Sequence, residues 1–312
     1  MKKKKIYGET LKDQLKASTR DRMYHFIMAS DTIRGVALHA TRMVNEMRWN
    51  HELGILETLV LGHAYMAAAL MSAQLKGDDR IRLGVECSGP IQGLSVEANA
   101  FGEVRGYLER VPIPVAKPLE SFDLSPFFGA GFISVTKHLH DAKHPFTGKV
   151  MMEYGSLAKD LALYHLKSEQ VPTSISLGIV FDRQGEVQGA GGLFLQALPG
   201  ADDNVLTQLE DLVRGLPSMG QAVGAEEFPG GWLDRTFQGL APRMLDQRGV
   251  EFMCHCNEQQ IRTMLTMLDP AELSDMAEKG PFPVEIRCHK CNTRYLFDQK
   301  GIQAISAQRT AG

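Results

Sequence analysis

The sequence has no long hydrophobic run. Its most apolar stretch, Leu56 to Met71, contains Glu57 and His63 and is too short to cross a bilayer unaided, so we expect a buried helix there. No apolar stretch follows the basic run Lys2 to Lys5, which excludes a secretory signal peptide and favours a solvated tail. With neither a span nor an export signal, we expect a cytoplasmic protein without a membrane partner, in a compartment that keeps thiols reduced.

An excess of positive charge is also absent. The chain has 34 Lys and Arg against 37 Asp and Glu, a formal net charge of -3, which argues against a nucleic-acid partner bound by neutralising phosphates. No residue pattern indicates an activated nucleophile, so we do not expect an enzyme. Gly189 to Gly192 lacks the lysine and the following helix of a phosphate-binding loop, and we interpret it as a tight bend in a strand.

Cysteine is scarce over most of the chain. Only Cys87 precedes residue 254, and its place on the apolar side of a predicted strand indicates a core residue. The other four cysteines form two tight pairs: Cys254, Cys256, Cys288 and Cys291. Each short turn aims two sulfurs at one point, so both pairs can close on a single tetrahedral metal ion. Four thiolates leave no open position for substrate or water, which indicates a structural site.

The spacing of the two pairs favours zinc, one ion per chain, because it is typical of zinc knuckles and differs from ferredoxin spacing. We expect His255 and His289 to lie outside the ligand set, since four thiolates are already present. Cations near the second pair are expected to lower thiol pKa values, namely Arg287, Lys290 and Arg294. Three other histidines, which we assign to a solvated loop, lack thiol or carboxylate company: His138, His140 and His144.

The chain as a whole predicts an α+β fold. Residues 1–198 indicate a core of mixed β-sheet and helices, in which alternation from Ile81 to Leu108 predicts a three-stranded meander. Apolar residues at helical spacing predict helices at 41–49, 55–75 and 156–167, the last with Ser156 as its N-cap. Further strands are expected at 27–39 (as a pair), 132–138, 149–154, 174–181 and 191–197.

Residues 199–250 predict a helical linker that is only metastable. Asp202 to Asn204 can begin one amphipathic helix, on which Leu209, Leu212 and Val213 share a face. The many glycines and prolines that follow allow only short helices, which are marginal without tertiary support. We therefore expect this segment to depend on packing against its neighbours.

Residues 251–312 predict a small C-terminal zinc-binding domain. Asn257 and Gln260 can form a capping box, and Asp269-Pro270 can begin a second helix that ends at Gly280. Two short strands should flank the second cysteine pair, with Asn292 in a left-handed conformation. A unit of this size buries little apolar surface, so a metal ion is expected to hold it folded.

These motifs resemble one family, the redox-regulated heat-shock chaperones known as heat shock protein 33. The resemblance rests on segments spread over nearly the whole chain: Phe101 to Tyr107, Ser168 to Gln170 with Pro172, Gly191 to Gly200, Phe252 to Cys256, and Cys288 to Asn292 with Tyr295 and Phe297. One small departure is Asn257, where a serine is commoner in the family.

The resemblance implies an ATP-independent holdase that is inactive when reduced and zinc-bound. Peroxide or hypochlorous acid, especially with heat, would activate it by forming disulfides Cys254-Cys256 and Cys288-Cys291, with zinc release. It also implies unfolding client proteins as partners, a homodimer in the active form, and a role for residues 1–198 in dimerisation and chaperone activity. Loss of the metal would unfold the C-terminal unit and free the linker, so we predict client contacts at Leu209, Leu212, Val213, Phe228, Trp232 and Phe237.

Two functions of other classes stay open at this point. One is a zinc-ribbon module that docks on nucleic acid or a ribosome, which would show salt-dependent binding of RNA. The other is an enzyme of thiol-disulfide exchange, which would need an exposed cysteine pair that cycles reversibly.

Overall fold

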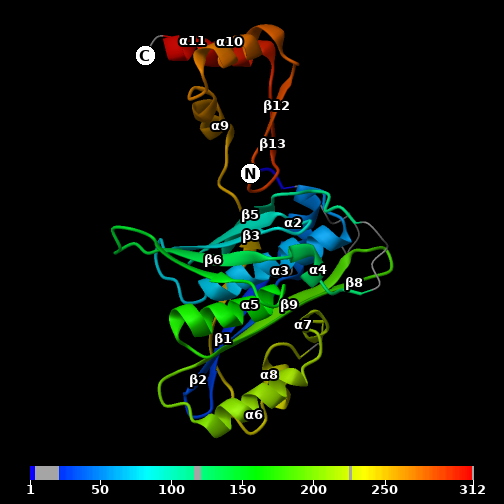
Figure 1. Ribbon diagram of the computed structural model, residues 1–312, viewed down its shortest axis with the longest axis vertical. Helices are drawn as coiled ribbons and strands as arrows, with labels where there is room; N and C mark the ends of the chain where they lie inside the picture. The colour runs from blue at the N-terminus through cyan, green and yellow to red at the C-terminus, as the bar shows by residue number, and fades with distance from the viewer. Residues whose placement is uncertain (4–20, 116–120, 225–226, 311–312) are drawn as a thin grey trace.

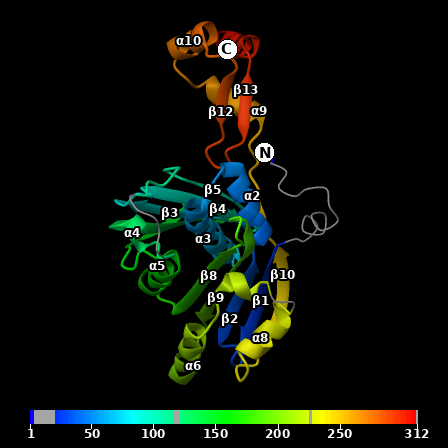
Figure 2. The same ribbon diagram turned by 90° about the vertical axis from the view of Figure 1, so that its right-hand side faces the viewer.

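Two β-sheets enclose one buried helix, and a small arm rises from one end of this body (Figure 1). The computed structural model describes residues 1–3, 21–115, 121–224 and 227–310. A group of short helices lies at the end of the body opposite the arm, in both views of the molecule (Figures 1 and 2). The predicted α+β fold class is confirmed.

The first sheet has five antiparallel strands in the order β10-β1-β2-β9-β8. Their bounds are β1 (Arg22–Met28), β2 (Ile33–His39), β8 (Thr173–Phe181), β9 (Val187–Ala197) and β10 (Arg243–Gly249). The predicted strand pair within 27–39 is correct, but the first strand begins earlier, at Arg22. We refer to this sheet as sheet A.

The glycines from Gly189 to Gly192 lie inside β9, and the register of β9 against β8 shifts next to Gly189. A Cβ at Gly189 would come within 2.1 Å of the Gly220 carbonyl oxygen. These glycines therefore also allow the backbone of a linker helix to approach the strand closely.

The second sheet, sheet B, has six strands in the order β11-β5-β4-β3-β6-β7. Their bounds are β3 (Arg80–Cys87), β4 (Gly93–Asn99), β5 (Glu103–Leu108), β6 (Gly131–His138), β7 (Phe146–Met151) and β11 (Glu251–Phe252). The predicted meander β3-β4-β5 is confirmed, whereas β7 begins and ends earlier than predicted. The edge strand β11 is the one parallel partner, and it pairs with β5.

Helix α3 (Ile55–Ser72) runs between the two sheets, and 89% of its residues are buried. It is long and apolar enough to span a membrane by length and composition, but it is apolar on every side because both sheets cover it. The prediction of a buried helix at 56–71 is confirmed. The other helices of the body are α2 (Thr41–His51), α4 (Ser125–Phe128), α5 (Leu157–Tyr164) and a π-helical turn, η1 (His165–Glu169).

The predicted cap of α5 is correct in position but not in chemistry. Ser156 occupies the N-cap, but its hydroxyl makes no capping hydrogen bond. The buried carboxylate of Asp160 accepts from the backbone amides of Glu153, Tyr154 and Ser156, and so fixes the chain before the helix.

The segment 199–250 is helical only in its first part. Helices α6 (Asp203–Arg214), α7 (Met219–Ala222) and α8 (Gly230–Thr236) cover the outer face of sheet A. The Asp202 carboxylate caps α6 by accepting from the Val205 amide at 2.9 Å, as predicted. The segment then ends in strand β10, which was not predicted. The residues of β10 are mostly exposed and show no apolar alternation.

The arm contains α9 (Glu258–Leu265), α10 (Pro270–Lys279), α11 (Gln299–Thr310) and the hairpin of β12 (Val284–Arg287) and β13 (Arg294–Phe297). The capping box of Asn257 and Gln260 is present, and Gly280 ends α10 at φ 72°, both as predicted. Asp269 caps α10 through the Ala271 amide. The last helix, α11, was not predicted.

Candidate metal centre

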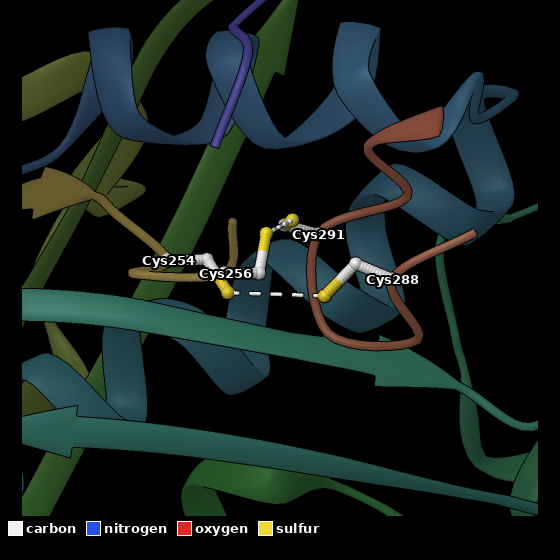
Figure 3. A group of neighbouring side chains, drawn as sticks. All are labelled: Cys254, Cys256, Cys288 and Cys291. Carbon is white, nitrogen blue, oxygen red and sulfur yellow. Dashed lines mark hydrogen bonds between the residues drawn. The ribbon is translucent and has the colours of Figure 1, made fainter. Parts of the chain in front are cut away.

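The four clustered cysteines meet at the junction between the body and the arm (Figure 3). Their sulfur atoms all lie within 4.8 Å of one another. Across the two pairs, the Sγ atoms of Cys254 and Cys288 are 3.9 Å apart, and those of Cys256 and Cys291 are 3.4 Å apart. Two segments far apart in sequence therefore deliver four sulfurs to one point.

The first pair is placed by sheet B. Strand β11 is held by hydrogen bonds from the amides of Glu251 and Met253 to the carbonyls of Gly102 and Val104, both 3.0 Å. The chain continues through Cys254 and Cys256 to the N-cap of α9 at Asn257, so both sulfurs come from a short link between a strand and a helix.

The second pair is placed by the turn of the β12-β13 hairpin. The carbonyl of Cys288 accepts from the amides of Cys291 at 3.3 Å and Asn292 at 2.7 Å, and the Cys288 amide donates to the Thr293 carbonyl at 2.9 Å. Asn292 adopts φ 53°, the left-handed conformation predicted for it. This tight turn brings the Cys288 and Cys291 sulfurs to the same side.

The geometry fits a tetrahedral ion such as zinc. With Zn–S bonds of about 2.3 Å, two sulfurs of a tetrahedron are about 3.8 Å apart. The measured separations of 3.4 and 3.9 Å bracket that value, and three of the four cysteines are buried. Four cysteines together could therefore hold a metal ion in a closed site, with no position left for a substrate.

The two neighbouring imidazoles turn away from the sulfurs. The Nε2 atom of His255 lies 2.8 Å from a carboxylate oxygen of Glu103, and the ring of His289 packs on Tyr107 with centroids 3.7 Å apart. Neither imidazole belongs to the group of close ligand atoms formed by the four cysteines.

The cation that contacts a sulfur is not one of the three expected. Arg105 donates from Nη1 to the Cys254 sulfur at 3.7 Å and is held by Glu97 at 2.9 Å. The predicted cations instead pair with carboxylates: Arg287 with Glu285, Lys290 with Glu97, and Arg294 with Glu52. The register of β5 against β4 explains why Arg105 has this role. It places Arg105 directly opposite Glu97, and their ion pair leaves a guanidinium nitrogen facing Cys254.

Shared hydrogen bonds separate the thiol pKa values. Those from Cys288 and Cys291 hold the pKa of Cys254 far below its usual range, and Arg105 acts in the same direction. The hydrogen bond to Cys254 raises the pKa of Cys288 to about 11 and also raises the pKa of Cys291. Binding of a metal ion by all four sulfurs would have to displace the protons that the raised pKa values keep on Cys288 and Cys291.

Two further hydroxyl groups contact the sulfurs and were not singled out from the sequence. The Tyr295 hydroxyl donates to the Cys256 sulfur at 3.1 Å, and the Cys291 thiol lies 3.2 Å from Oγ1 of Thr293. Burial, and then the hydrogen bond to Cys256, raise the pKa of Tyr295, so this group stays a proton donor at neutral pH. Such contacts orient thiolate ligands in metal sites.

The body holds the second cysteine turn directly. Asn50, near the end of α2, donates to the Cys291 carbonyl, and Asn292 donates back to the Asn50 carbonyl at 3.0 Å. On the other side, the Gly106 amide of β5 donates to the Lys290 carbonyl at 3.1 Å. The metal centre is therefore part of the interface between body and arm, which the sequence could not indicate.

The residues predicted to contact clients lie far from this centre, in a second apolar core. Trp232 and Phe237 are buried with ring centroids 6.3 Å apart, and Phe237 also packs on Phe26 of sheet A. The same core contains Leu209, and Leu212, Val213 and Phe228 pack against it partly buried. All six residues thus cover the outer face of sheet A.

The remaining candidates form no second centre among the described residues. Cys87 is half-buried at the end of β3, and burial raises the pKa of its thiol. His138 ends β6, and His140 and His144 are exposed in the loop that follows, in agreement with the solvated loop expected there.

An α+β body with a four-cysteine cluster between it and a small arm defines a class of protein whose cysteines could hold a metal ion in a structural site. A family model described as Hsp33 protein matches residues 21–298. The 33 kDa chaperonin of Desulforamulus reducens is 35% identical over 288 residues, covering 92% of this chain and 97% of that protein. The 33 kDa chaperonin of Bacillus subtilis is 31% identical over 287 residues, with 89% and 95% covered.

Among solved structures, the 33 kDa chaperonin (heat shock protein 33 homolog) of Thermotoga maritima is similar with a TM-score of 0.84 and 29% identity. The match covers 94% of this chain and all of that chain. The chain therefore belongs to the Hsp33 family of chaperones, and the resemblance seen in its motifs is confirmed.

Proposed function

We propose that this protein is a redox-regulated, ATP-independent holdase of the cytoplasm, which prevents aggregation of unfolding proteins during oxidative and heat stress. The observation that supports the proposal most is the position of the four sulfurs, because they join two segments that only a folded chain brings together. Any reaction that removes these thiolates from a common ligand would weaken the attachment of the arm to the body.

In the reduced state, Cys254, Cys256, Cys288 and Cys291 would hold one zinc ion per chain. Zinc, when bound, supplies charge neutralisation for four thiolates and a crosslink between the two cysteine pairs. The protein contributes Arg105 and the Tyr295 hydroxyl, which offset the negative charge of two of the sulfurs. The arm buries a small apolar surface, so this crosslink contributes a large share of its stability.

Oxidation converts the four thiolates to two disulfides, Cys254-Cys256 and Cys288-Cys291. For each disulfide, two thiolates lose two electrons, one peroxide O–O bond breaks, and two added protons give two water molecules. A disulfide sulfur is a poor metal ligand, so the oxidised cysteines would no longer hold a metal ion. Each disulfide would form within one cysteine pair, although in the reduced geometry sulfurs of different pairs also lie close, at 3.9 Å for Cys254 and Cys288 and 3.4 Å for Cys256 and Cys291.

The structure suggests a route from the centre to the linker that differs from the one expected. The linker helices pack on sheet A and not on the C-terminal unit, so loss of that unit does not remove their docking surface. The connection is instead the chain itself, because β10 leads through Val250 and β11 directly to Cys254 (Figure 2). Release of Cys254 frees β11, then β10, and finally the helices that end at β10.

Unfolding of the linker would expose two apolar surfaces at once. One is the set of linker residues Leu209, Leu212, Val213, Phe228, Trp232 and Phe237, and the other is the outer face of sheet A that they cover, including Phe26 and Leu193. Exposed apolar surface of this extent is what unfolding proteins bind. The same exposure favours a homodimer of the active form.

The test is to treat reduced, zinc-loaded protein with peroxide at elevated temperature while zinc release and light scattering by an unfolding client are recorded together. We expect both signals to change in parallel, with suppression of scattering only after zinc release. A variant with polar residues at Trp232 and Phe237 should release zinc normally but suppress scattering less.

Three outcomes would contradict the proposal. Zinc release without gained protection would remove the switch, and turnover of a disulfide substrate would indicate a thiol-disulfide exchange enzyme. A salt-dependent complex of the reduced protein with RNA would indicate nucleic-acid docking.

A further inference from the structure

The first three residues of the chain lie against the metal centre, although the match to the Hsp33 family begins only at residue 21. The Met1 nitrogen donates to the Cys256 carbonyl at 2.7 Å, and the Lys2 amide donates to Oγ1 of Thr293 at 3.4 Å. Both acceptors belong to the cysteine turns. This contradicts the solvated tail predicted for Lys2 to Lys5, as far as Met1–Lys3 are concerned; Lys4 and Lys5 lie outside the described residues.

The side chain of Lys3 joins the body to β11. Its ammonium lies 2.7 Å from a carboxylate oxygen of Glu46 on α2 and 3.3 Å from one of Glu251 on β11. Glu46 is only 6% exposed and also accepts from Arg42 at 2.9 Å, so its charge is largely removed from water. Lys3 itself lines a groove of about 380 Å³, whose other charged walls are the carboxylates of Asp21, Glu46 and Glu251 and the guanidinium of Arg42.

The charges of this groove suit a basic segment. Without Lys3, the carboxylates of Glu46 and Glu251 would face each other across α2 and β11 with like charge, which disfavours docking of the strand. With the ammonium between them, both carboxylates attract the same cation, and each favours the position of the other. Lys3 thus acts where β11 meets the body, at Glu251, three residues before the first cysteine, Cys254.

We propose that Met1–Lys3 form an intramolecular strap that docks in the acidic groove of Glu46 and Glu251 and holds the Cys254–Cys256 segment in the inactive arrangement. The inference rests on the proposed function, because it assigns a regulatory role at the same switch. The strap contacts both cysteine turns, α2 and β11, and undocking of the first cysteine pair must separate these four elements. Its contacts therefore raise the oxidant threshold of the switch.

The chain offers a matched control for the test. Lys3→Glu reverses the charge that bridges the two carboxylates, whereas Lys2→Glu makes the same change one residue away, on a side chain that is exposed. Both variants are made in the full-length protein, reduced and loaded with zinc. Two quantities are measured: the rate of hydrogen exchange at the Glu251 and Met253 amides, and the rate of zinc release to a chromogenic chelator under peroxide.

We expect Lys3→Glu to raise both rates about three- to tenfold, as for loss of a partly buried ion pair, and Lys2→Glu to change neither by more than about twofold. Salt should raise the exchange rate of the parent protein toward that of Lys3→Glu. Equal rates for Lys3→Glu and the parent would overturn the strap, as would an equal increase for both variants.

A charge swap checks that the effect comes from the bridge. Glu251→Lys alone should speed both rates, and the double variant Lys3→Glu with Glu251→Lys should recover at least half of the loss, since one cation again lies between two carboxylates. Double-variant rates equal to the sum of the two single effects would count against the strap.

Failure of the strap and failure of the proposed function give different results. If the parent protein binds no zinc, or gains no client protection on oxidation, the proposed function fails. If the parent behaves as proposed and Lys3→Glu matches it, only the strap fails.

Discussion

Phe252 should be the residue that fastens the metal centre to the body. Its side chain is fully buried, and its ring packs on Tyr65 of α3 and His51 of α2 at centroid distances of 6.0 and 6.1 Å. Strand β11 has only two residues, so two backbone hydrogen bonds and this one ring carry most of its docking. Phe252→Ala removes that ring and leaves a cavity.

The magnitude follows from the burial. Truncation of a fully buried phenylalanine to alanine costs about 3–5 kcal/mol. If β11 opens as a local unit, that loss falls on the opening equilibrium, and each 1.4 kcal/mol is a factor of ten. Hydrogen exchange at the Glu251 and Met253 amides should therefore accelerate by between about a hundredfold and a few thousandfold.

The assay is native-state hydrogen exchange on the reduced, zinc-loaded protein, followed by the dose of peroxide that gives half-maximal client protection. We expect fast exchange at β11, slow exchange at α3, and a lower peroxide dose. Phe101→Ala is the matched control, because it makes the same change close by in sequence on a side chain that is 65% exposed. A folded Phe252→Ala protein whose β11 exchange stays within about threefold of the parent would refute the reasoning.

Two further predictions concern other residues of the body. Gly102→Ala should also free β11, since Gly102 has φ 83° and a Cβ there would come within 2.1 Å of the Gly249 carbonyl oxygen. Faster exchange at the Glu251 amide checks this, and unchanged exchange would contradict it. Burial lowers the pKa of His63 and of His165 from 6.5 to about 4, so between these pH values the unfolded chain binds more protons than the folded chain. The free energy of unfolding should therefore fall as the pH drops from 6.5 toward 4, by up to about 2.7 kcal/mol per pH unit for the two groups together. Denaturant unfolding at pH 7 and 5 measures this, and equal stability at both would contradict it.

Much of the local structure was predictable because the responsible signals are local. Asp202 and Asn257 cap their helices as their side chains suggest, and the meander from β3 to β5 follows from strict alternation. The metal-centre geometry was anticipated for the same reason, since each cysteine pair is fixed by its own short turn.

What the sequence could not indicate depends on contacts between distant segments. Strand β10 is polar and exposed, and it is a strand only because β1 offers it an open edge. Arg105 reaches Cys254, and Asn50 reaches Cys291, across separations that no periodicity reports. The glycines of β9 likewise have their reason in the backbone of α7, a helix too short to be recognised from its own residues.

The path of residues 243–252 links the two sheets, and it would set how sensitive the proposed switch is. This stretch forms an edge strand of sheet A, β10, and then an edge strand of sheet B, β11. Val250 is the one residue between the two strands, so neither strand can move far without the other. With one residue between the two strands, release of β11 would directly disturb the last residue of β10. We expect variants with extra residues inserted at Val250 to keep both sheets intact. In such variants, release of Cys254 would disturb β10 and the linker helices less.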